Sequence, residues 1–365
     1  MRLVLFSTLG TGLADWQRTG TLARELELYR RVAPSVAEVV LVTYGEATEE
    51  RRLLAQAAPE LGLLAVPRGA AAARSLVLGR RLPAGCAILK TNQMRGAWAA
   101  VRARRPGDRV YVRTGYTWSW TARRMRSPWH RALRGIERWT LARADLASVT
   151  SDAQRRYLRH TGVCRSARLV VAPNHVDLDT FAPRPRRAER DIVVVGRLSS
   201  EKRPALVLAA AARGGYRATF AGAGPLAAPL EQHARRIGVD AHFLGAVPNG
   251  ELPELFARHH LFVQASAFEN MPKSLVEAMA SGIPVVACRA PGVSELVEPG
   301  CGALADGTAV GLANQIAAAL ADPAAAAARA ARARAMVVER FSLDAAVARE
   351  LALYARLSGG EACPS

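Results

Sequence analysis

Short apolar runs alternate with amphipathic segments along the whole chain of 365 residues. Apolar runs bounded by turn residues are typical of buried strands, and strands that alternate with helical patterns indicate βαβ units and parallel sheets. We therefore expect an α/β protein of two doubly wound, Rossmann-like domains, and neither an all-helical nor an all-β fold. The expected strands are 3–6, 39–43, 63–66, 87–89, 110–112, 146–149 and 169–171 in the first half, and 192–195, 218–221, 242–244, 261–263 and 285–287 in the second.

The periodicity is interrupted between residues 179 and 191, where prolines and an arginine pair precede the next strand. This interruption predicts a first domain over 1–182 and a second over 188–342, followed by a C-terminal helix and tail over 343–365. Ligands of open α/β sheets lie at the carboxyl ends of the strands. Two such domains facing each other across a cleft would hold two substrates.

Charge is distributed unevenly between the halves. Residues 1–187 contain 33 Lys and Arg against 14 Asp and Glu, whereas residues 188–365 contain 17 of each, so the whole net charge of +19 lies in the first half. A basic half favours an anionic partner such as nucleic acid, a phospholipid surface or a phosphorylated acceptor. The alternative is an Arg-rich proteome with solvated surfaces, although that bias would raise both halves alike.

Cysteine usage and the N-terminus indicate a cytoplasmic protein. Five cysteines are scattered without C-x-x-C spacing and are expected to be reduced thiols. The first apolar run is too short for a signal peptide, and the alanine-rich stretch near 317–328 is interrupted by Asp322 and Pro323. Any membrane contact is therefore expected to be peripheral.

The most informative segment spans residues 268–287, where seven residues separate Glu269 from Glu277. Pro272 suits the first position of a helix, and the free N–H groups that follow it would bind phosphate. Glu277 would reach a ribose diol, and Glu269 would face the group that the phosphate carries. Two solvated glutamates on an amphipathic helix are the alternative. The expected donor-binding residues here are Asn270, Met271, Lys273, Ser274, Leu275 and Glu277.

This segment resembles the signature of the retaining glycosyltransferases of family four. The resemblance implies a GT-B architecture, with the acceptor on the N-terminal domain, the nucleotide-sugar donor on the C-terminal domain, and a last helix that crosses back to the first domain. It also implies transfer with retention of configuration. The resemblance extends over Val195-Gly196-Arg197-Leu198 with Glu201-Lys202, Phe220 to Pro225, Phe243-Leu244-Gly245 and Pro291 to Glu295.

Arg197 and Lys202 follow the first strand of the donor domain, where two cations would neutralise a diphosphate leaving group. With Glu269 they form the expected catalytic group. The chain has three lysines against 47 arginines, and Lys90, Lys202 and Lys273 all lie in segments of interest, which favours sites that fit a compact ammonium. Gly222 and Val247 are also expected at the donor, although the glycine turn suits a plain strand-to-helix connection equally well.

Polar and glycine-rich loops follow the strands of the first domain. They suit an acceptor, and the alternatives are a tight turn and polar loops that close a sheet edge. The family resemblance implies a His after strand 110–112, and this chain has Arg113, Thr114 or Tyr116 there instead. The expected acceptor and cleft residues are Gly10, Thr11, Gly12, Lys90, Asn92, Arg113, Thr114 and Tyr116.

Asp177-Leu178-Asp179 looks like a metal-binding D-x-D motif. It follows Pro173-Asn174-His175-Val176, which resembles the Pro-Asn-Gly-Val-Asp turn of family four with His175 in place of the glycine. We therefore expect Asp177 to be structural, no metal, and no cofactor besides the nucleotide-sugar co-substrate.

Residues 123–139 mix arginines with Trp, Met, Leu and Ile at near-helical spacing. The segment suits the anionic inner face of the plasma membrane, and equally an ordinary surface helix. The expected partners are a nucleotide-sugar and an anionic glycan or lipid-linked acceptor of cell-surface polysaccharide synthesis. Nucleic acid would explain the basic half but not the two glutamates, so none is expected. A same-fold epimerase or phosphorylase stays open.

Overall fold

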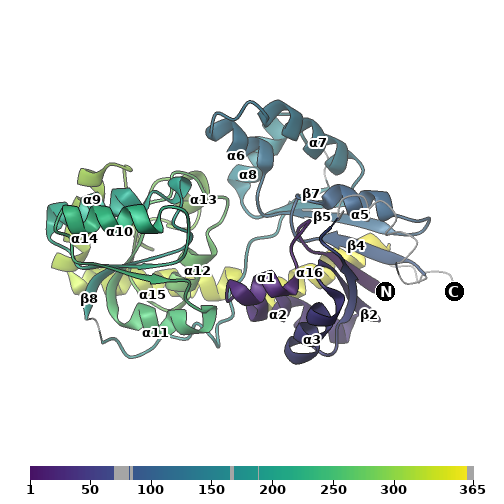
Figure 1. Cartoon of the computed structure of the whole chain (residues 1–365), viewed down its shortest axis with the longest axis horizontal. Coiled ribbons are helices and arrows are strands. Elements are labelled where there is room, and N and C mark those ends of the chain that lie inside the picture. The colour runs from purple at the N-terminus through teal and green to yellow at the C-terminus, as the bar shows by residue number, and fades with distance from the viewer. Residues whose placement is uncertain (70–81, 83–84, 165–167, 188, 360–365) are drawn as a thin grey trace. The chain divides into compact units, whose positions relative to one another are not determined.

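A computed structural model describes residues 1–69, 82, 85–164, 168–187 and 189–359 of the chain. The chain forms two compact units, the first from Met1–Pro173 with Ala346–Ser365 and the second from Asn174–Ala345 (Figure 1). Each unit has a parallel sheet with helices. The predicted α/β class with two doubly wound domains is confirmed.

The first unit is built on a seven-stranded sheet of order β3-β2-β1-β4-β5-β6-β7. The order reverses between β1 and β4, which pair in register from Arg2↔Ala87 to Phe6↔Thr91. Its strands are β1 (Arg2–Phe6), β2 (Glu38–Tyr44), β3 (Gly62–Val66), β4 (Ala87–Thr91), β5 (Arg109–Thr114), β6 (Leu146–Val149) and β7 (Leu169–Val171). Its helices are α1 (Leu13–Arg18), α2 (Leu22–Val32), α3 (Ala47–Ala57), α5 (Ala97–Ala103), α6 (Trp118–Arg124), α7 (His130–Ala142) and α8 (Asp152–His160).

The second unit has a six-stranded sheet of order β10-β9-β8-β11-β12-β13, which reverses between β8 and β11. The short strand β13 was not predicted, because Ala303–Ala305 is too brief to show as an apolar run. The strands are β8 (Arg190–Val195), β9 (Ala218–Ala221), β10 (Ala241–Gly245), β11 (His259–Gln264), β12 (Val285–Cys288) and β13 (Ala303–Ala305). The helices are α9 (Pro204–Gly214), α10 (Ala227–Arg236), α11 (Leu252–Ala257), α12 (Lys273–Ala280), α13 (Pro291–Ser294), α14 (Ala309–Ala321) and α15 (Pro323–Phe341), and α16 (Leu343–Ser358) leads from this unit into the first.

Both faces of the second sheet are covered, as its strand sequences require. Successive side chains of a strand point to opposite faces. On β11, Phe262 packs into one buried cluster with Met279 of α12, whereas Leu261 and Val263 pack into another with Ile316 of α14. Continuous apolar runs are typical of strands that are buried on both sides. This burial fixes how β8 and β11 are placed in the sheet, and so where their carboxyl ends lie.

The division between the units lies after Pro173, before the segment 179–191 where sequence periodicity placed it. The residues that follow Pro173 are tied to the second unit. Nδ2 of the Asn174 side chain donates to the carbonyl of Met271 at 2.8 Å. The side chains of Val176 and Phe181 belong to a buried cluster of that unit. Sequence periodicity therefore placed the boundary too late, because the polar and proline residues that interrupt the pattern lie within the second unit.

Lys90 is wholly buried, contrary to the expectation that it faces a cleft. Its Nζ lies 2.8 Å from Oε2 of Glu350 on α16 and donates to the hydroxyl of Tyr354 at 3.1 Å. The rings of Tyr29, Tyr111 and Tyr354 have their centroids 5.1, 5.2 and 5.5 Å from the ammonium, within cation–π range. Lys90 therefore joins α16 to the first sheet and is not accessible to an acceptor.

Cys164, Cys288 and Cys301 are buried thiols that form no disulfide, whereas Cys86 is disulfide-bonded, so the expectation of five reduced thiols is wrong for Cys86. Cys363 lies outside the described residues. Within the part of the chain that the structure describes, no helix has the length and apolar character needed to cross a bilayer.

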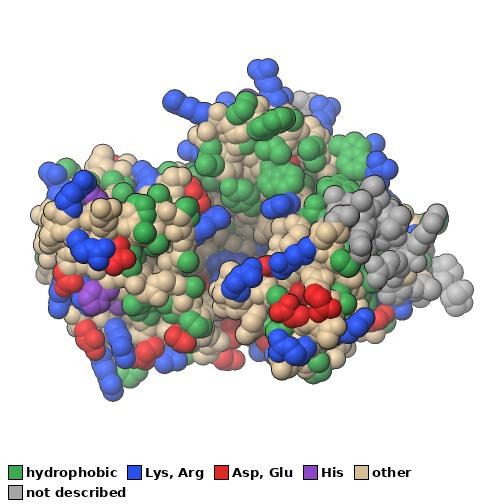
Figure 2. All heavy atoms as spheres, in the orientation of Figure 1, with side chains coloured by type: hydrophobic (Ala, Val, Ile, Leu, Met, Phe, Trp, Pro, Cys, Tyr) green, Lys and Arg blue, Asp and Glu red, His purple; other side chains and the backbone are tan. Residues whose placement is uncertain are grey.

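Large hydrophobic side chains are exposed in one region of the first unit. Figure 2 shows hydrophobic side chains, with basic ones beside them, over α6 and α7. The exposed residues of this region are Tyr116, Met125, Trp129 and Ile136.

Candidate functional site

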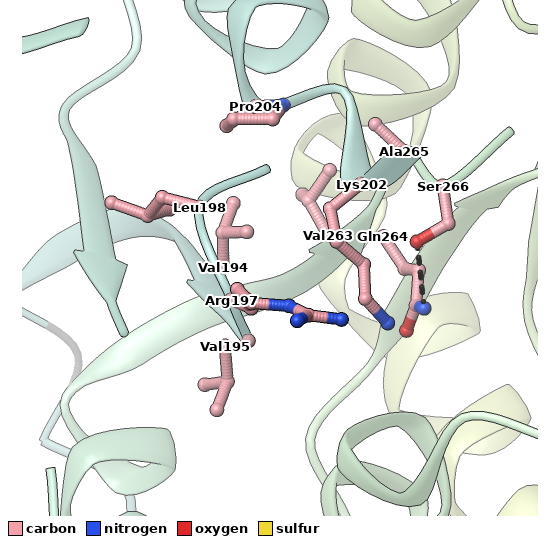
Figure 3. A pocket seen from close by; sticks show the side chains of 11 residues that line it. Val194, Val195, Arg197, Leu198, Lys202, Pro204, Val263, Gln264, Ala265 and Ser266 are labelled. Atoms are coloured by element: carbon pink, nitrogen blue, oxygen red, sulfur yellow. Dashed lines mark hydrogen bonds between the residues drawn. The ribbon is translucent and has the colours of Figure 1, made fainter. Parts of the chain in front are cut away.

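The candidate site lies where β8 and β11 end side by side. The two strands pair directly, with Phe262 opposite Val193, and the strand order reverses between them. Open α/β sheets bind ligands outside the carboxyl ends of the strands at such a reversal. A small pocket is found there (Figure 3), lined by Val194, Val195, Gly196, Arg197, Leu198, Lys202, Pro204, Val263, Gln264, Ala265 and Ser266.

Close backbone packing shapes the loop after β8. A Cβ atom on Gly222 would lie 2.0 Å from the carbonyl oxygen of Gly196, so no larger residue fits at position 222 unless the backbone shifts. Arg203 has a left-handed φ of 49° just before Pro204 opens α9, and its Nε donates to the carbonyl of Ala265 at 2.6 Å. The loops after β8 and β11 are thereby held together, and Gly222 has a packing reason to be glycine.

Lys202 and Glu269 form an ion pair across these two loops. Nε2 of Gln264, at the end of β11, donates to Oε1 of Glu269 at 3.0 Å and to Oγ of Ser266 at 3.1 Å. The side chain of Lys202 is 28% exposed and its ammonium has three N–H donors, so it retains capacity for ligand oxygens. Two predicted residues are thus brought together, and the structure adds Gln264 to them.

Gln264 was not anticipated from the sequence, since it is one polar residue at the end of an apolar strand. Its side chain is 95% buried, with a relative exposure of 5%. Oε1 of Gln264 has no hydrogen-bond partner among the described residues. The amide orientation follows from Glu269, because a carboxylate attracts the amide nitrogen and repels the amide oxygen. A buried acceptor therefore lines the pocket, and no residue that the structure describes donates to it.

Arg197 extends from the same loop with 67% of its side chain exposed, and lies 3.4 Å from Glu201. Figure 3 shows the charged ends of Arg197 and Lys202 pointing to the same place beside Gln264. Burial acts to raise the pKa of Glu201, but the hydrogen bond from Ser199 and the charges of Arg197 and Lys202 outweigh it and lower that pKa. The carboxylate therefore stays ionised and helps to position Arg197.

Helix α12 begins at Lys273, with Pro272 at the N-cap and not at the first helical position. Its first N–H groups have no acceptor within the helix, which suits an anion. Glu277, one turn further on, is buried and accepts a hydrogen bond from Nδ2 of Asn249 at 3.1 Å. Glu277 is thus a buried carboxylate held in place, and its role as a ribose ligand stays a prediction.

The other predicted donor residues differ in exposure. Asn270 and Met271 are buried, and the carbonyl of Asn270 packs so tightly that a Cβ on Gly292 would lie 1.9 Å from it. Val247 packs against the cluster that contains Leu275. Lys273 and Ser274 are partly exposed, whereas Leu275 is a core residue, so its side chain contacts the protein interior and only its backbone N–H suits a ligand.

The glycine loop of the first unit leads into α1, whose first N–H groups are bonded to a glutamate of the protein. Glu50 is buried, and its carboxylate accepts hydrogen bonds from the N–H groups of Leu13 at 2.8 Å and Ala14 at 3.3 Å. The start of α1 therefore already holds a negative charge. Gly12 is buried beside this carboxylate, and a Cβ atom at position 12 would lie 2.4 Å from it. Gly10 is exposed and Thr11 is partly exposed.

The remaining acceptor-side residues lie after β4 and at the end of β5. Thr114 is wholly buried and donates to the carbonyl of Tyr116 at 3.1 Å, so it supports the loop from inside and is not accessible to a substrate. Asn92 and Arg113 are partly exposed and Tyr116 is exposed. Of the five predicted residues in and after β4 and β5, these three are accessible, whereas Lys90 and Thr114 are not.

Asp177 uses both carboxylate oxygens locally. One accepts from the N–H of Asp179 at 3.1 Å and the other from the hydroxyl of Thr180 at 2.6 Å. These contacts are those of a turn residue. Among the described residues, no group of three or more metal-ligating acidic, His or Cys side chains is found.

Comparison with known proteins agrees with this geometry. Glycosyl transferases group 1 matches residues 177–336, and Glycosyltransferase Family 4 matches residues 25–180. The 2-deoxystreptamine glucosyltransferase of Streptomyces kanamyceticus is 30% identical over 64% of this chain and 66% of its own. A D-inositol 3-phosphate glycosyltransferase of Mycolicibacterium paratuberculosis is 36% identical over 60% of this chain and 54% of its own. The chain thus spans about half to two thirds of the length of these relatives.

Solved structures share the fold over nearly the whole chain. A sucrose-phosphate synthase from Thermosynechococcus elongatus superposes with a TM-score of 0.82 at 19% identity, covering 99% of this chain and 100% of its own. Anabaena HepE in complex with UDP-glucose has a TM-score of 0.74 at 23% identity, covering 96% of this chain and 99% of its own. The two family matches establish that the chain belongs to the family-4 glycosyltransferases, and the solved structures agree in showing the GT-B fold.

Proposed function

We propose that the chain is a retaining glycosyltransferase that moves a sugar from a nucleotide diphosphate to a glycan or lipid-linked acceptor in cell-surface polysaccharide synthesis, at the inner face of the plasma membrane. The observation that carries the proposal is the grouping of Lys202, Glu269 and Glu277 around the ends of β8 and β11 and the start of α12. Structural neighbours in complex with UDP and UDP-glucose support a nucleotide-sugar donor.

In this proposal the second unit holds the donor. The start of α12, Lys202 and Arg197 would bind the diphosphate, Glu277 the ribose diol and Glu269 the sugar hydroxyls. Lys202 has three donors and one protein carboxylate, so phosphate oxygens can share its ammonium without breaking the pair with Glu269. Preorganised positive charge at a leaving group lowers the barrier most when it sits in a partly desolvated site.

The transfer step balances without an added acid or base. The bond between the anomeric carbon and the diphosphate oxygen breaks, and a glycosidic bond forms to the acceptor oxygen on the same face of the sugar. The acceptor proton passes to the departing diphosphate. We propose that Arg197 and Lys202 supply the charge for this step, and that no metal is required.

The first unit is proposed to bind the acceptor. Its high positive charge suits an anionic acceptor, and Asn92, Arg113 and Tyr116 are the accessible side chains at the expected edge of its sheet. Lys90 and Thr114 would act indirectly, through the shape of that edge, because both are buried.

A transfer assay tests the proposal. The purified protein is incubated with UDP-, GDP-, dTDP- and ADP-sugars, with and without a membrane glycolipid extract, and in the presence or absence of a chelator. Nucleotide diphosphate release that depends on the extract and survives the chelator, with a product of the donor's anomeric configuration by NMR, is expected. An inverted product, a sugar isomerised without acceptor, or phosphorolysis in phosphate buffer would contradict it.

A further inference from the structure

The surface formed by residues 123–138 carries three large hydrophobic side chains that the protein does not cover. Trp129 is 70% exposed, Met125 is 60% exposed and Ile136 is 43% exposed. Exposed indole and thioether groups in one region usually mark an interaction site. Trp129 is the N-cap residue of α7, and Ala132 and Ile136 follow it at i+3 and i+7, so the three lie along one face of the helix.

A hydrogen-bonded turn holds the tip of this surface in place. The N–H of Ser127 donates to the carbonyl of Ala122 at 2.8 Å, and that of Arg126 to the carbonyl of Arg123 at 3.1 Å. Arg126 has a φ of 55°, a left-handed conformation that costs free energy in a residue other than glycine. The turn ends α6 sharply, with Met125 inside the turn and Trp129 two residues after it.

Charge on this surface has one sign. Between residues 123 and 138, all of which the structure describes, the one acidic residue is Glu137. It is buried and accepts hydrogen bonds from the N–H and hydroxyl groups of Ser119, so it ties α7 to α6 and gives no negative charge to the surface. The exposed arginines are Arg123, Arg124, Arg126, Arg131, Arg134 and Arg138.

We propose that residues 123–138 dock the protein on an anionic lipid bilayer. Trp129, Met125 and Ile136 enter the boundary between headgroups and acyl chains, and the arginines contact lipid phosphates. The inference deepens the proposed function, on which it rests for the lipid-linked acceptor, although the docking itself needs no donor. Nucleic acid fits less well, because bases stack on flat rings and Trp129 is the one large aromatic exposed among these residues.

Sedimentation with vesicles tests the docking surface. The protein is mixed with vesicles of phosphatidylcholine and phosphatidylglycerol in equal parts, or of phosphatidylcholine alone, at low and high salt. We expect it to sediment with the anionic vesicles and to be released by salt. Arg131→Gln with Arg134→Gln should weaken binding about 25-fold, at about fivefold per arginine. Met125→Ser with Trp129→Ser should weaken binding to the anionic vesicles at low salt, although this double variant keeps every arginine.

Matched variants of the second unit serve as controls. Leu244→Ser with Val338→Ser removes exposed hydrophobic groups there, and Arg213→Gln with Arg236→Gln removes exposed charges, so both should bind vesicles like the parent protein. Equal sedimentation with neutral vesicles, none with anionic ones, equal loss in the control variants, or capture by single-stranded DNA in place of vesicles would overturn the proposal. UDP binding measured in the same variants separates the two claims: docking with no nucleotide binding would leave the surface standing and contradict the donor site.

Discussion

Lys202 and Glu269 form an ion pair between residues 67 positions apart in the chain. Their strands, β8 and β11, are neighbours in the sheet, and each residue follows its strand by a few positions. The sheet topology thus brings a cation next to a carboxylate, the two side chains that we propose contact the phosphate and the sugar of the donor. This pairing is the core of the donor site proposed above.

Substitution of Lys202 tests its role in leaving-group stabilisation. Lys202→Ala should lower kcat about a hundredfold or more, because the diphosphate loses a fixed positive charge in the transition state. Lys202→Arg should recover part of this loss at most, since a forked guanidinium does not occupy the place of a compact ammonium. Steady-state rates of nucleotide release give the comparison, with thermal unfolding as the folding control. A folded Lys202→Ala protein with unchanged kcat would remove Lys202 from the mechanism.

Gln264 is predicted to position Glu269 and to accept a hydrogen bond from the bound nucleotide-sugar. Gln264→Leu keeps the volume but removes both functions, so kcat should fall about tenfold or more, with a smaller change in KM. Gln264→Asn should rescue part of the rate, and Ser266→Ala should have a small effect. Kinetics with donors that differ in one sugar hydroxyl would show which hydroxyl is contacted. A lower Tm with normal kcat would instead indicate a purely structural role.

Apolar runs predicted most strands because strands such as β2, β4 and β9 are buried along nearly their whole length in parallel sheets, which leaves a continuous apolar pattern. The positions of the two glutamates, one before α12 and one a turn into it, were also predictable, since both are set by local sequence. Long-range contacts were not. The pairing of Lys90 with Glu350, and of Glu50 with the start of α1, joins segments that no periodicity relates.

Gln264 shows a second limit of sequence reasoning. A single polar residue at the end of a strand is common, and its meaning depends on whether its amide meets a partner in the fold. Here the amide nitrogen meets Glu269 and the oxygen meets none among the described residues. That distinction required coordinates.

Removing one partner of the buried Lys90–Glu350 ion pair should destabilise the protein more than removing both partners. Burial lowers the pKa of Lys90, and the charge of Glu350 opposes that shift. Lys90→Met should destabilise the first unit by about 3–5 kcal/mol, because it leaves a buried carboxylate without its cation. Lys90→Met with Glu350→Leu should restore much of this loss. Denaturant unfolding measures both, and an additive double variant would contradict the coupling.

His259 predicts a pH dependence of the second unit. It is buried between the carbonyl of Leu255 at 2.7 Å and the hydroxyl of Thr219 at 2.8 Å, and burial lowers its pKa from 6.5. As the pH falls, His259 therefore binds a proton at a higher pH in the unfolded chain than in the folded one. Stability from this residue is therefore full above pH 6.5 and is lost as the pH falls from there toward the folded pKa.

Thermal unfolding at successively lower pH checks the role of His259. His259→Gln should flatten the decline in Tm below pH 6.5, whereas His160→Gln, at an exposed position of the first unit, should leave it unchanged. The same slope in His259→Gln as in the parent protein would assign the pH dependence to other groups.

Calorimetric titration of the purified protein with UDP, GDP, dTDP and ADP tests the donor site most directly. We predict micromolar binding of one nucleotide, weakened about tenfold or more in Glu277→Ala, because a buried carboxylate that accepts ribose hydroxyls is lost. Glu251→Ala, at an exposed position near Asn249, should bind like the parent protein. Binding of one nucleotide with equal affinity in Glu277→Ala and the parent protein would contradict the site at the ends of β8 and β11.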